Sequence, residues 1–353
     1  MTSKSPEAAT PTDGPEGLHV SGIESWYQAN VAHTTLPLRF DRLAGGHSNL
    51  TYRVTDAGGQ VTVLRRPPAG ELLASAHDMS REYRAISALG PTPVPVPEAV
   101  AFCEDPAVTG AWFYVMGFVD GAVLHDDADV EAWLADPAGR RRTGESIVEV
   151  AAALHRADID AIGLGELGKR EEYVARQLKR WYRQYQDSGG TTELIDRLHE
   201  HFINHTPRQQ HASLVHGDYR LGNCITAADG TIAAVLDWEI CTLGDPLADL
   251  GYLLAMWAEP GETFRTTATC PTSLPGFPTR AELIAHYGRH SDLDLSDIGT
   301  YVAFSYWKVA CINQGVWSRY AAGQKAAEGV DVDAIGQSVP RLAELAAAAL
   351  ETT

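Results

Sequence analysis

The sequence predicts an α+β fold made of a small antiparallel β-sheet lobe and a larger, mainly helical lobe. Short apolar runs typical of strands are concentrated before residue 119, whereas residues spaced for helices dominate after it. At 353 residues the chain is long enough to bury two lobes or two domains. We therefore expect a flexible tail over residues 1–20, a first lobe over 21–118 and a second lobe over 119–353.

The first lobe is predicted to hold a short opening helix, five strands and one further helix. The opening helix is expected over residues 21–32, where apolar side chains gather on one face. The expected strands cover residues 38–43, 50–54, 60–64, 99–103 and 112–118. Asp56-Ala-Gly-Gly59 is typical of a hairpin turn between two of them. The further helix is expected over residues 77–89, before a proline-rich connector.

The second lobe is predicted to be helical, with one interruption by strands. Ile147, Val150, Ala151 and Leu154 recur at helical spacing and indicate a buried helix. Further helices are expected over residues 173–185, 194–202 and, with a break at the Pro- and Thr-rich residues 258–278, from about 245 to 350. Short apolar strands at 214–215 and 232–236 lie between these helical regions.

The composition argues against several classes of protein. A net charge of −18 is unsuited to a nucleic-acid surface, which needs basic patches. No apolar run approaches the roughly 20 residues that span a bilayer, and the polar first residues do not have the apolar core of a signal peptide. The five cysteines form no C-x-x-C pair, which favours neither a disulfide framework nor structural zinc. A reducing cytoplasm is the expected location.

A group of polar residues after the first of these strands is the strongest functional signal in the chain. His216, Asp218 and Asn223 follow residues 214–215, and Asp237 follows the second strand. Phosphoryl transfer needs a carboxylate that orients a hydroxyl group and oxygen ligands that hold Mg²⁺. The spacing therefore predicts Asp218 as the catalytic carboxylate and Asn223 and Asp237 as the magnesium ligands. His216 is expected to brace the loop.

These residues and their surroundings resemble the aminoglycoside phosphotransferase and choline kinase superfamily, a relative of the protein kinases. The resemblance begins near Leu38 and covers most of the chain. The subgroup linked to acyl-CoA dehydrogenases is the most similar, on Val63-Leu-Arg-Arg-Pro-Pro68, Ala76-His77 with Arg81-Glu82-Tyr83, and Asp237-Trp-Glu with Gly244-Asp-Pro-Leu-Ala-Asp249. The resemblance implies the protein-kinase-like fold, with ATP and Mg²⁺ bound between the two lobes.

The resemblance also implies which residues contact the nucleotide. Residues 45–49 form a glycine-rich loop whose backbone N–H groups can approach phosphates. Arg65 takes the place of the usual phosphate-binding lysine, and Glu82 is its expected ion-pair partner, with Glu71 less favoured. Residues 116–119 correspond to the hinge that meets the adenine. The expected nucleotide-binding residues are Gly45, Gly46, Ser48, Asn49, Arg65, Glu82, Met116 and Phe118.

The sequence leaves two possible roles open for several charged residues. Arg66 is a neighbouring candidate for the phosphate contact, but strand alternation should direct it away from Arg65, and it could be a solvated surface residue. Arg220 could contact the transferred phosphate or face solvent. Lys308 and Arg319 could meet an anionic group of the acceptor or lie on a helix surface. Asp249 resembles the residue that braces the catalytic loop, and Gly163-Leu-Gly-Glu-Leu-Gly168 is expected to be a loop, since no strand precedes it.

The leading hypothesis is an ATP- and Mg²⁺-dependent phosphotransferase that phosphorylates a hydroxyl of a small molecule. The subgroup implies a hydroxyacyl-CoA or related metabolite and a functional link to an acyl-CoA dehydrogenase, with no nucleic-acid or membrane partner. An aminoglycoside O-phosphotransferase is the alternative within the same chemistry. A catalytically silent nucleotide-binding pseudokinase is the other, although the presence of Asp218, Asn223 and Asp237 argues against it.

Overall fold

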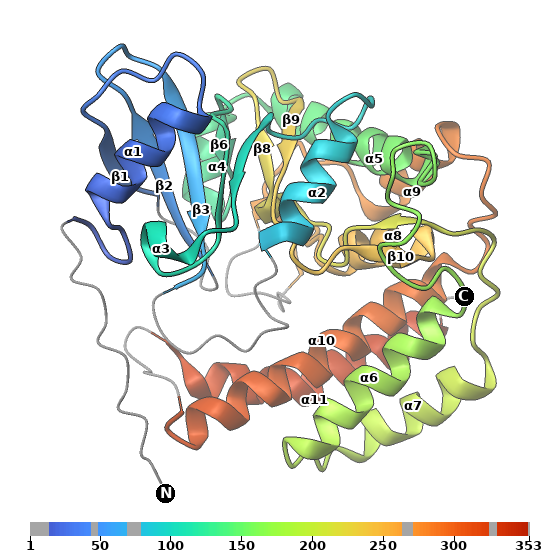
Figure 1. The fold of residues 1–353 in the computed structure, drawn as a ribbon. Coiled ribbons are helices and arrows are strands. Elements are labelled where there is room, and N and C mark those ends of the chain that lie inside the picture. The colour runs from blue at the N-terminus through green and yellow to red at the C-terminus, as the bar shows by residue number, and fades with distance from the viewer. Residues whose placement is uncertain (1–13, 44–48, 69–78, 263–270, 325–329, 352–353) are drawn as a thin grey trace, which may run out of the picture. The chain divides into compact units, whose positions relative to one another are not determined.

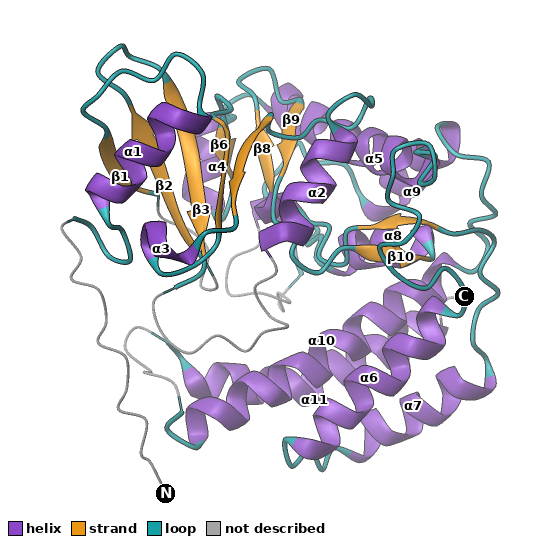
Figure 2. Ribbon diagram, in the orientation of Figure 1, coloured by secondary structure: helices purple, strands orange, loops and turns teal. Residues whose placement is uncertain are grey.

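The computed structural model describes residues 14–43, 49–68, 79–262, 271–324 and 330–351 (Figure 1). They form two compact units. The first unit consists of the chain up to Pro91, Val96–Val119 and the short segment Asp237–Glu239. The second unit consists of Thr92–Pro95, Asp120–Leu236 and the chain from Ile240 onward. The prediction of an α+β fold is confirmed, because the first unit is built on an antiparallel sheet and the second is mainly helical (Figure 2).

The first unit contains a five-stranded antiparallel sheet in the order β1-β2-β3-β5-β4. Its strands are β1 (Arg39–Arg42), β2 (Leu50–Thr55), β3 (Val61–Arg66), β4 (Ala99–Cys103) and β5 (Phe113–Gly117). Buried and partly exposed residues alternate along β2, which shows that one face of this strand packs on the core. All five predicted strands are therefore present, with ends that shift by one or two residues.

Three helices accompany this sheet: α1 (Val20–Asn30), α2 (Met79–Leu89) and the short α3 (Pro106–Thr109). Helix α1 lies against the sheet (Figure 1) and buries Ile23 and Tyr27 in one cluster with Tyr52 of β2. Helix α2 packs near β4, where the rings of Tyr83 and Phe102 stack with centroids 5.2 Å apart. This packing holds Glu82, which lies on α2, at a fixed place beside the sheet.

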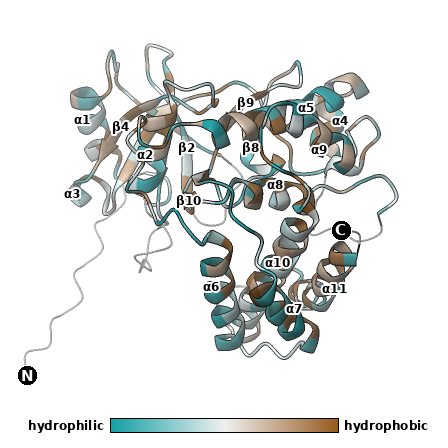
Figure 3. Ribbon diagram, turned by 90° about the vertical axis from the view of Figure 1, so that its right-hand side faces the viewer, coloured by the Kyte–Doolittle hydropathy of each residue, from teal (hydrophilic) through white to brown (hydrophobic). Residues whose placement is uncertain are grey.

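The strands of the second unit form two small sheets. One has the order β6-β8-β9, with β6 (Ala122–Val123), β8 (Cys224–Thr226) and β9 (Ile232–Val235), and the other pairs β7 (Ser213–Val215) with β10 (Thr242–Gly244). Figure 3 shows β8 and β9 as hydrophobic segments, and most of their residues are buried. Strands β8 and β9 form a hairpin between Asn223 and Asp237, and strand β7 carries the residues that precede His216.

Eight α-helices make up most of the described part of the second unit. They are α4 (Asp127–Trp133), α5 (Pro137–Arg156), α6 (Tyr173–Asp187), α7 (Glu193–Asn204), α8 (Pro246–Ala255), α9 (Arg280–Arg289), α10 (Ile298–Ala321) and α11 (Val332–Glu351). Helix α10 packs against α6, α8 and α11 (Figure 1). Helix α8 begins as expected at Asp245-Pro246, where the Asp245 carboxylate accepts a hydrogen bond of 3.1 Å from the N–H of Leu247.

The described residues bear on two further points, membrane-spanning helices and the G-x-G-x-x-G pattern. Within them, no helix combines the length and the apolar character needed to cross a bilayer. Residues 163–168 form turns between α5 and α6 and do not follow a strand, so the G-x-G-x-x-G pattern here is a loop. Gly163 has a φ of 77°, a conformation that glycine adopts without steric cost.

Candidate active site

The loop after β7 brings Asp218 and Asn223 into direct contact. The side-chain amide nitrogen of Asn223 donates to the backbone carbonyl of Asp218 over 2.9 Å and to its carboxylate oxygen Oδ2 over 2.7 Å. A short 3-10 turn (Leu221–Asn223) closes the loop and orients Asn223. Because the amide nitrogen makes both bonds, the amide oxygen of Asn223 is the atom that is suited to hold a cation.

His216 braces this loop through both ring nitrogens. Its Nε2 lies 2.8 Å from the carbonyl oxygen of Leu236, and its Nδ1 lies 3.2 Å from the backbone nitrogen of Asp218. A carbonyl can only accept and an N–H can only donate, so the ring carries its proton on Nε2 and accepts at Nδ1. His216 therefore links the loop after β7 to the end of the β8–β9 hairpin, as expected for a structural histidine.

Asp249 on α8 supports the start of the same loop. Its carboxylate accepts hydrogen bonds from the backbone N–H groups of His216, over 2.6 Å, and Gly217, over 2.8 Å. Complete burial, the largest influence, would raise the pKa of Asp249, but the nearby His155, the charge of His216 and the bond from Gly217 outweigh it and lower the pKa. Asp249 thus stays ionised and braces the loop, which agrees with the expectation from sequence.

Lys308 lies in the middle of α10 and is only 6% exposed. Its ammonium group donates to the carbonyl oxygen of Gly217 over 2.8 Å and lies 4.7 Å from the centroid of the Tyr252 ring. Burial lowers the pKa of Lys308, although the negative charges of Asp218 and Asp249 oppose this shift. Of the two interpretations of Lys308, a position on the helix surface is therefore wrong, because Lys308 is buried and supports the loop after β7. Arg319, near the end of α10, is exposed.

Replacement of Lys308 by methionine is expected to reduce turnover without unfolding the protein. Methionine fills a similar volume and removes the cost of burying an ammonium group, but it leaves a buried acceptor without its donor, so we expect the free energy of unfolding to fall by about 1–3 kcal/mol. The carbonyl of Gly217 loses its donor, and the resulting shift of the loop should lower kcat by about 10- to 100-fold. Thermal unfolding and steady-state kinetics measure the two effects. Lys179→Met, on the exposed face of α6, is the matched control, and equal kcat in both variants would contradict this role.

Two further side chains contact the carboxylate of Asp218. The hydroxyl of Tyr252 is hydrogen-bonded to it, and burial, reinforced by the charge of Asp218, raises the pKa of Tyr252 well above its usual value. The Nε of Arg220 lies 3.4 Å from Asp218 oxygens. Gly222 leaves room for this arrangement, since a Cβ at that position would lie 2.3 Å from Nη1 of Arg220. Asp218 is thus an ordered carboxylate with donors on several sides.

Arg65 lies among carboxylates in the first unit. Its Nε forms an ion pair with Glu82 over 3.0 Å, and its Nη2 forms another with Asp237 over 2.9 Å. The side chains of Arg65 and Glu82 are only 12% and 1% exposed. The hydroxyl of Tyr114 donates a further bond of 2.9 Å to Glu82. The ion pair that we expected between Arg65 and Glu82 is present, and Asp237 shares the same guanidinium group.

The charges of this cluster depend on one another. Burial raises the pKa of Glu82 and the charge of Asp237 adds to this effect, whereas Arg65 and the hydrogen bond from Tyr114 oppose it. The carboxylates in turn raise the pKa of Arg65, although burial, the largest single influence, would lower it. A permanent cation at position 65 therefore opposes the effect of burial on the pKa of Glu82.

Glu239 and Asn49 also belong to this cluster, although no role for Glu239 was predicted from the sequence. One oxygen each from Glu82, Asp237 and Glu239 lies within 4.8 Å of the others. The amide nitrogen of Asn49 donates to Glu239 over 3.2 Å, and the amide oxygen of Asn49 is buried with no hydrogen-bond partner among the described residues. This set of oxygen ligands fits Mg²⁺. The signal in the sequence was the D-x-E spacing after β9.

Asp237 also has an unusual backbone conformation. Its φ is 66°, in the left-handed region that few non-glycine residues adopt. Such a conformation costs on the order of 1 kcal/mol and is often found at functional sites. Here it directs the Asp237 carboxylate to Arg65 immediately after the buried strand β9 has ended.

Arg66 differs from its expected environment. It is 3% exposed, and its guanidinium group donates to the carbonyl oxygen of Pro67 and to the carbonyl and hydroxyl oxygens of Thr109 at the end of α3. A solvated surface position for Arg66 is therefore wrong. The reason is that α3 covers this side of the strand and supplies the hydrogen-bond acceptors that a buried guanidinium needs.

The remaining predicted nucleotide residues are only partly described. Gly45, Gly46 and Ser48 lie outside the described residues. Met116 is a buried residue of β5 and pairs with Val63 of β3 and Ala99 of β4. Phe118 follows the end of β5, and the guanidinium of Arg53 lies 4.9 Å from its ring centroid.

A second group of potential metal ligands lies elsewhere in the second unit, at Glu149, His286 and His290. Two arginines already occupy its ligand atoms. Arg142 donates to both carboxylate oxygens of Glu149, and Arg289 lies 2.6 Å from Nδ1 of His286. In the structure, these side chains form a network of ion pairs and hydrogen bonds.

Comparison with known proteins identifies the family. Residues 39–282 match the family described as "Phosphotransferase enzyme family". The chain belongs to this phosphotransferase family. A crystal structure of a presumptive aminoglycoside phosphotransferase from Ralstonia eutropha JMP134 is similar, with 33% identity and a TM-score of 0.79 over 94% of this chain and 98% of that chain. The GDP complex of aminoglycoside 2′-phosphotransferase-IIIa shares the fold, with 16% identity and a TM-score of 0.61 over 93% and 97% of the two chains.

Curated relatives of this phosphotransferase carry a different name. "Acyl-CoA dehydrogenase family member 10" of Mus musculus is 34% identical over 319 residues, which cover 89% of this chain and 29% of the relative. The phosphotransferase thus spans less than a third of that protein. The name and the identity of this relative confirm the resemblance to the subgroup named after acyl-CoA dehydrogenases.

Proposed function

We propose that this phosphotransferase moves the γ-phosphate of ATP to a hydroxyl group of a small molecule. The observation that carries the proposal is the catalytic loop, in which Asn223 and Tyr252 hold the carboxylate of Asp218 in place. In the reaction, the acceptor oxygen forms a bond to the γ-phosphorus while the bond between that phosphorus and the ADP oxygen breaks. Asp218 orients the acceptor hydroxyl and receives its proton.

We assign the nucleotide to the first unit. In this assignment Arg65, kept in place by Glu82, binds the phosphates, and Asn49 with Gly45, Gly46 and Ser48 covers them. The backbone around Met116 and Phe118 meets the adenine. The ion pair of 3.0 Å between Arg65 and Glu82 supports this assignment, since it presents a permanent cation on a rigid strand.

Asn223 and Asp237 are the proposed Mg²⁺ ligands, with Glu239 as a further carboxylate beside Asp237. Bound Mg²⁺ would neutralise the charge that develops on the phosphate oxygens. The support is chemical: these residues supply the oxygen ligands that Mg²⁺ prefers, and the asparagine nitrogen is already bonded to Asp218.

A hydroxyacyl-CoA or a related metabolite is the acceptor that we favour, in functional connection with an acyl-CoA dehydrogenase. The support is the name and the identity, 34%, of the mouse relative. An aminoglycoside is the second candidate, and the name of the Ralstonia eutropha protein favours it. Both acceptors would use the same Asp218.

A panel of acceptors tests the proposal. Purified protein, ATP and Mg²⁺ are mixed with hydroxyacyl-CoAs, aminoglycosides and amino alcohols, and ADP release and the phosphorylated product are followed. We expect transfer to a hydroxyacyl-CoA and its loss when EDTA removes the metal, because the phosphate charge is then no longer neutralised. Asp218→Asn serves as the control. Binding of ATP without transfer to any acceptor would indicate a silent nucleotide-binding module, and absence of ATP binding would overturn the proposal.

A further inference from the structure

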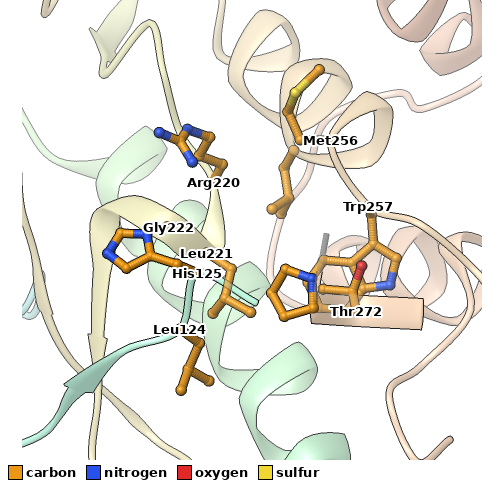
Figure 4. A pocket seen from close by; sticks show the side chains of 10 residues that line it. Leu124, His125, Arg220, Leu221, Gly222, Met256, Trp257 and Thr272 are labelled. Atoms are coloured by element: carbon orange, nitrogen blue, oxygen red, sulfur yellow. The ribbon is translucent and has the colours of Figure 1, made fainter. Parts of the chain in front are cut away.

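A small pocket opens beside the catalytic loop in the second unit (Figure 4). It is lined by residues of four regions: the loop after β6, the loop after β7, the end of α8 with the two residues that follow it, and the 3-10 turn Pro271–Ser273. These residues are Leu124, His125, Arg220, Leu221, Gly222, Leu253, Met256, Trp257, Pro271 and Thr272. Arg220 connects the pocket to the reaction centre, because its Nε lies 3.4 Å from the carboxylate of Asp218.

The inner wall of the pocket is apolar and held in place. Leu124, Leu253 and Trp257 are each at most 1% exposed. The indole N–H of Trp257 donates a hydrogen bond of 2.9 Å to the carbonyl oxygen of Pro278. The hydroxyl of Thr272 donates a hydrogen bond of 2.9 Å to the carbonyl oxygen of Ala258. Since both polar groups have acceptors within the protein, the wall offers an occupant mainly apolar contact.

The opening of the pocket differs from its apolar inner wall in carrying a charged side chain. In Figure 4, Arg220 and His125 lie on one side of it and Met256 and Trp257 on the other. The guanidinium of Arg220 is a permanent cation and donates hydrogen bonds only. It would repel an ammonium group that came close to Asp218, and it would accommodate a neutral or anionic group. This charge disfavours a polycationic aminoglycoside at this place.

The pocket is also small. Its cavity volume is about 30 Å³, and a cavity needs about 10–15 Å³ on this measure to hold one water molecule, so it has room for only one or two. A methyl group fits such a space, whereas a longer alkyl chain would have to displace Met256 or Leu253. Displacement of packed side chains is unfavourable, because well-packed interiors tolerate added methylene groups poorly.

We propose that this pocket is a subsite for the acceptor and that it receives a methyl-sized group on the carbon that bears the reacting hydroxyl. The inference depends on the proposed function, since it takes Asp218 as the residue that orients this hydroxyl. The acceptor is then a neutral or anionic secondary alcohol with a short alkyl end. Its larger remainder lies outside the pocket.

Matched acceptor pairs test this subsite. Each pair is a β- or a γ-hydroxyacyl-CoA in which the hydroxyl-bearing carbon carries either a methyl or a propyl group. We expect wild-type protein to favour the methyl member by at least about 10-fold in kcat/KM, which is the discrimination that small apolar pockets achieve. Met256→Ala, which enlarges the pocket, should reduce or reverse this preference by about 10-fold and leave the KM for ATP unchanged.

The control and the outcomes separate this inference from the proposed function. Ile203→Ala changes an exposed residue of α7, 57% exposed, and should keep the wild-type preference. Met256→Val gives a smaller change if Met256→Ala does not fold. Transfer with equal preference in wild type and both Met256 variants would overturn the subsite alone, as would transfer to aminoglycosides only. An absence of transfer to every acceptor would overturn the subsite and the proposed function together.

Discussion

Replacement of Asp218 by asparagine is expected to lower kcat by about 10²–10⁴-fold, because an amide cannot take the proton of the acceptor hydroxyl. The side-chain oxygen of asparagine can still accept the bond from Asn223, so the loop should keep its shape. We therefore expect the melting temperature and the Kd for ATP to stay close to the wild-type values. Single-turnover transfer to an acceptor from the panel measures the chemical step.

Asp187→Asn is the matched control for this change. Asp187 is an exposed residue at the end of α6, and its replacement should leave kcat unchanged. A wild-type rate in Asp218→Asn would show that Asp218 is not the catalytic carboxylate. A loss of rate that is accompanied by a large fall in melting temperature would assign Asp218 a structural role.

Replacement of Arg65 by methionine is expected to lower the free energy of unfolding by about 3–5 kcal/mol, because it leaves buried carboxylates without their cation. Burial already raises the pKa of Glu82 while Arg65 is present, and the variant should raise it further. A group whose folded pKa is raised contributes stability below its unfolded pKa and loses it as the pH rises through the folded pKa. The difference in the free energy of unfolding between wild type and Arg65→Met should therefore be small in acid and grow as the pH rises. Chemical denaturation of wild type and variant across this range measures it.

Arg39→Met is the control for Arg65→Met. Arg39 pairs with Asp41 on the surface, where its side chain is 69% exposed, and its loss should change stability by less than about 0.5 kcal/mol. Two outcomes would contradict the predicted coupling between Arg65 and Glu82. One is an equal loss of unfolding free energy in both variants, and the other is a loss in Arg65→Met that does not change with pH.

The arginine at position 65 has a geometric explanation. It contacts Glu82 through Nε and Asp237 through Nη2, so two nitrogens of one planar group serve two carboxylates. Lysine has a single nitrogen on a flexible stem and cannot reproduce this fork. Arg65→Lys should therefore retain the charge yet stabilise the cluster less than arginine. An arginine at the position of the usual kinase lysine thus allows one side chain to pair with both Glu82 and Asp237.

Much of the fold could be predicted because it depends on local patterns. The five strands and α2 follow from apolar spacing, and α8 begins at Asp245-Pro246 because an N-cap aspartate and a proline at the first helical position favour a helix start. The contact between Asp218 and Asn223 is also local, since both lie in one short loop. Short-range geometry is encoded in neighbouring residues and can be read from their order.

The sequence by itself determined the fold class, the family resemblance and the loop that joins Asp218 to Asn223. Only the tertiary structure decided which charged residues are buried and with what partners. Arg65 and Asp237 are 172 positions apart, and Lys308 reaches Gly217 over 91 positions. Arg66 is buried because α3 covers it, and Glu239 joins the cluster because its segment packs with the first unit. Burial and charge pairing depend on such distant contacts, which the local order of residues does not specify.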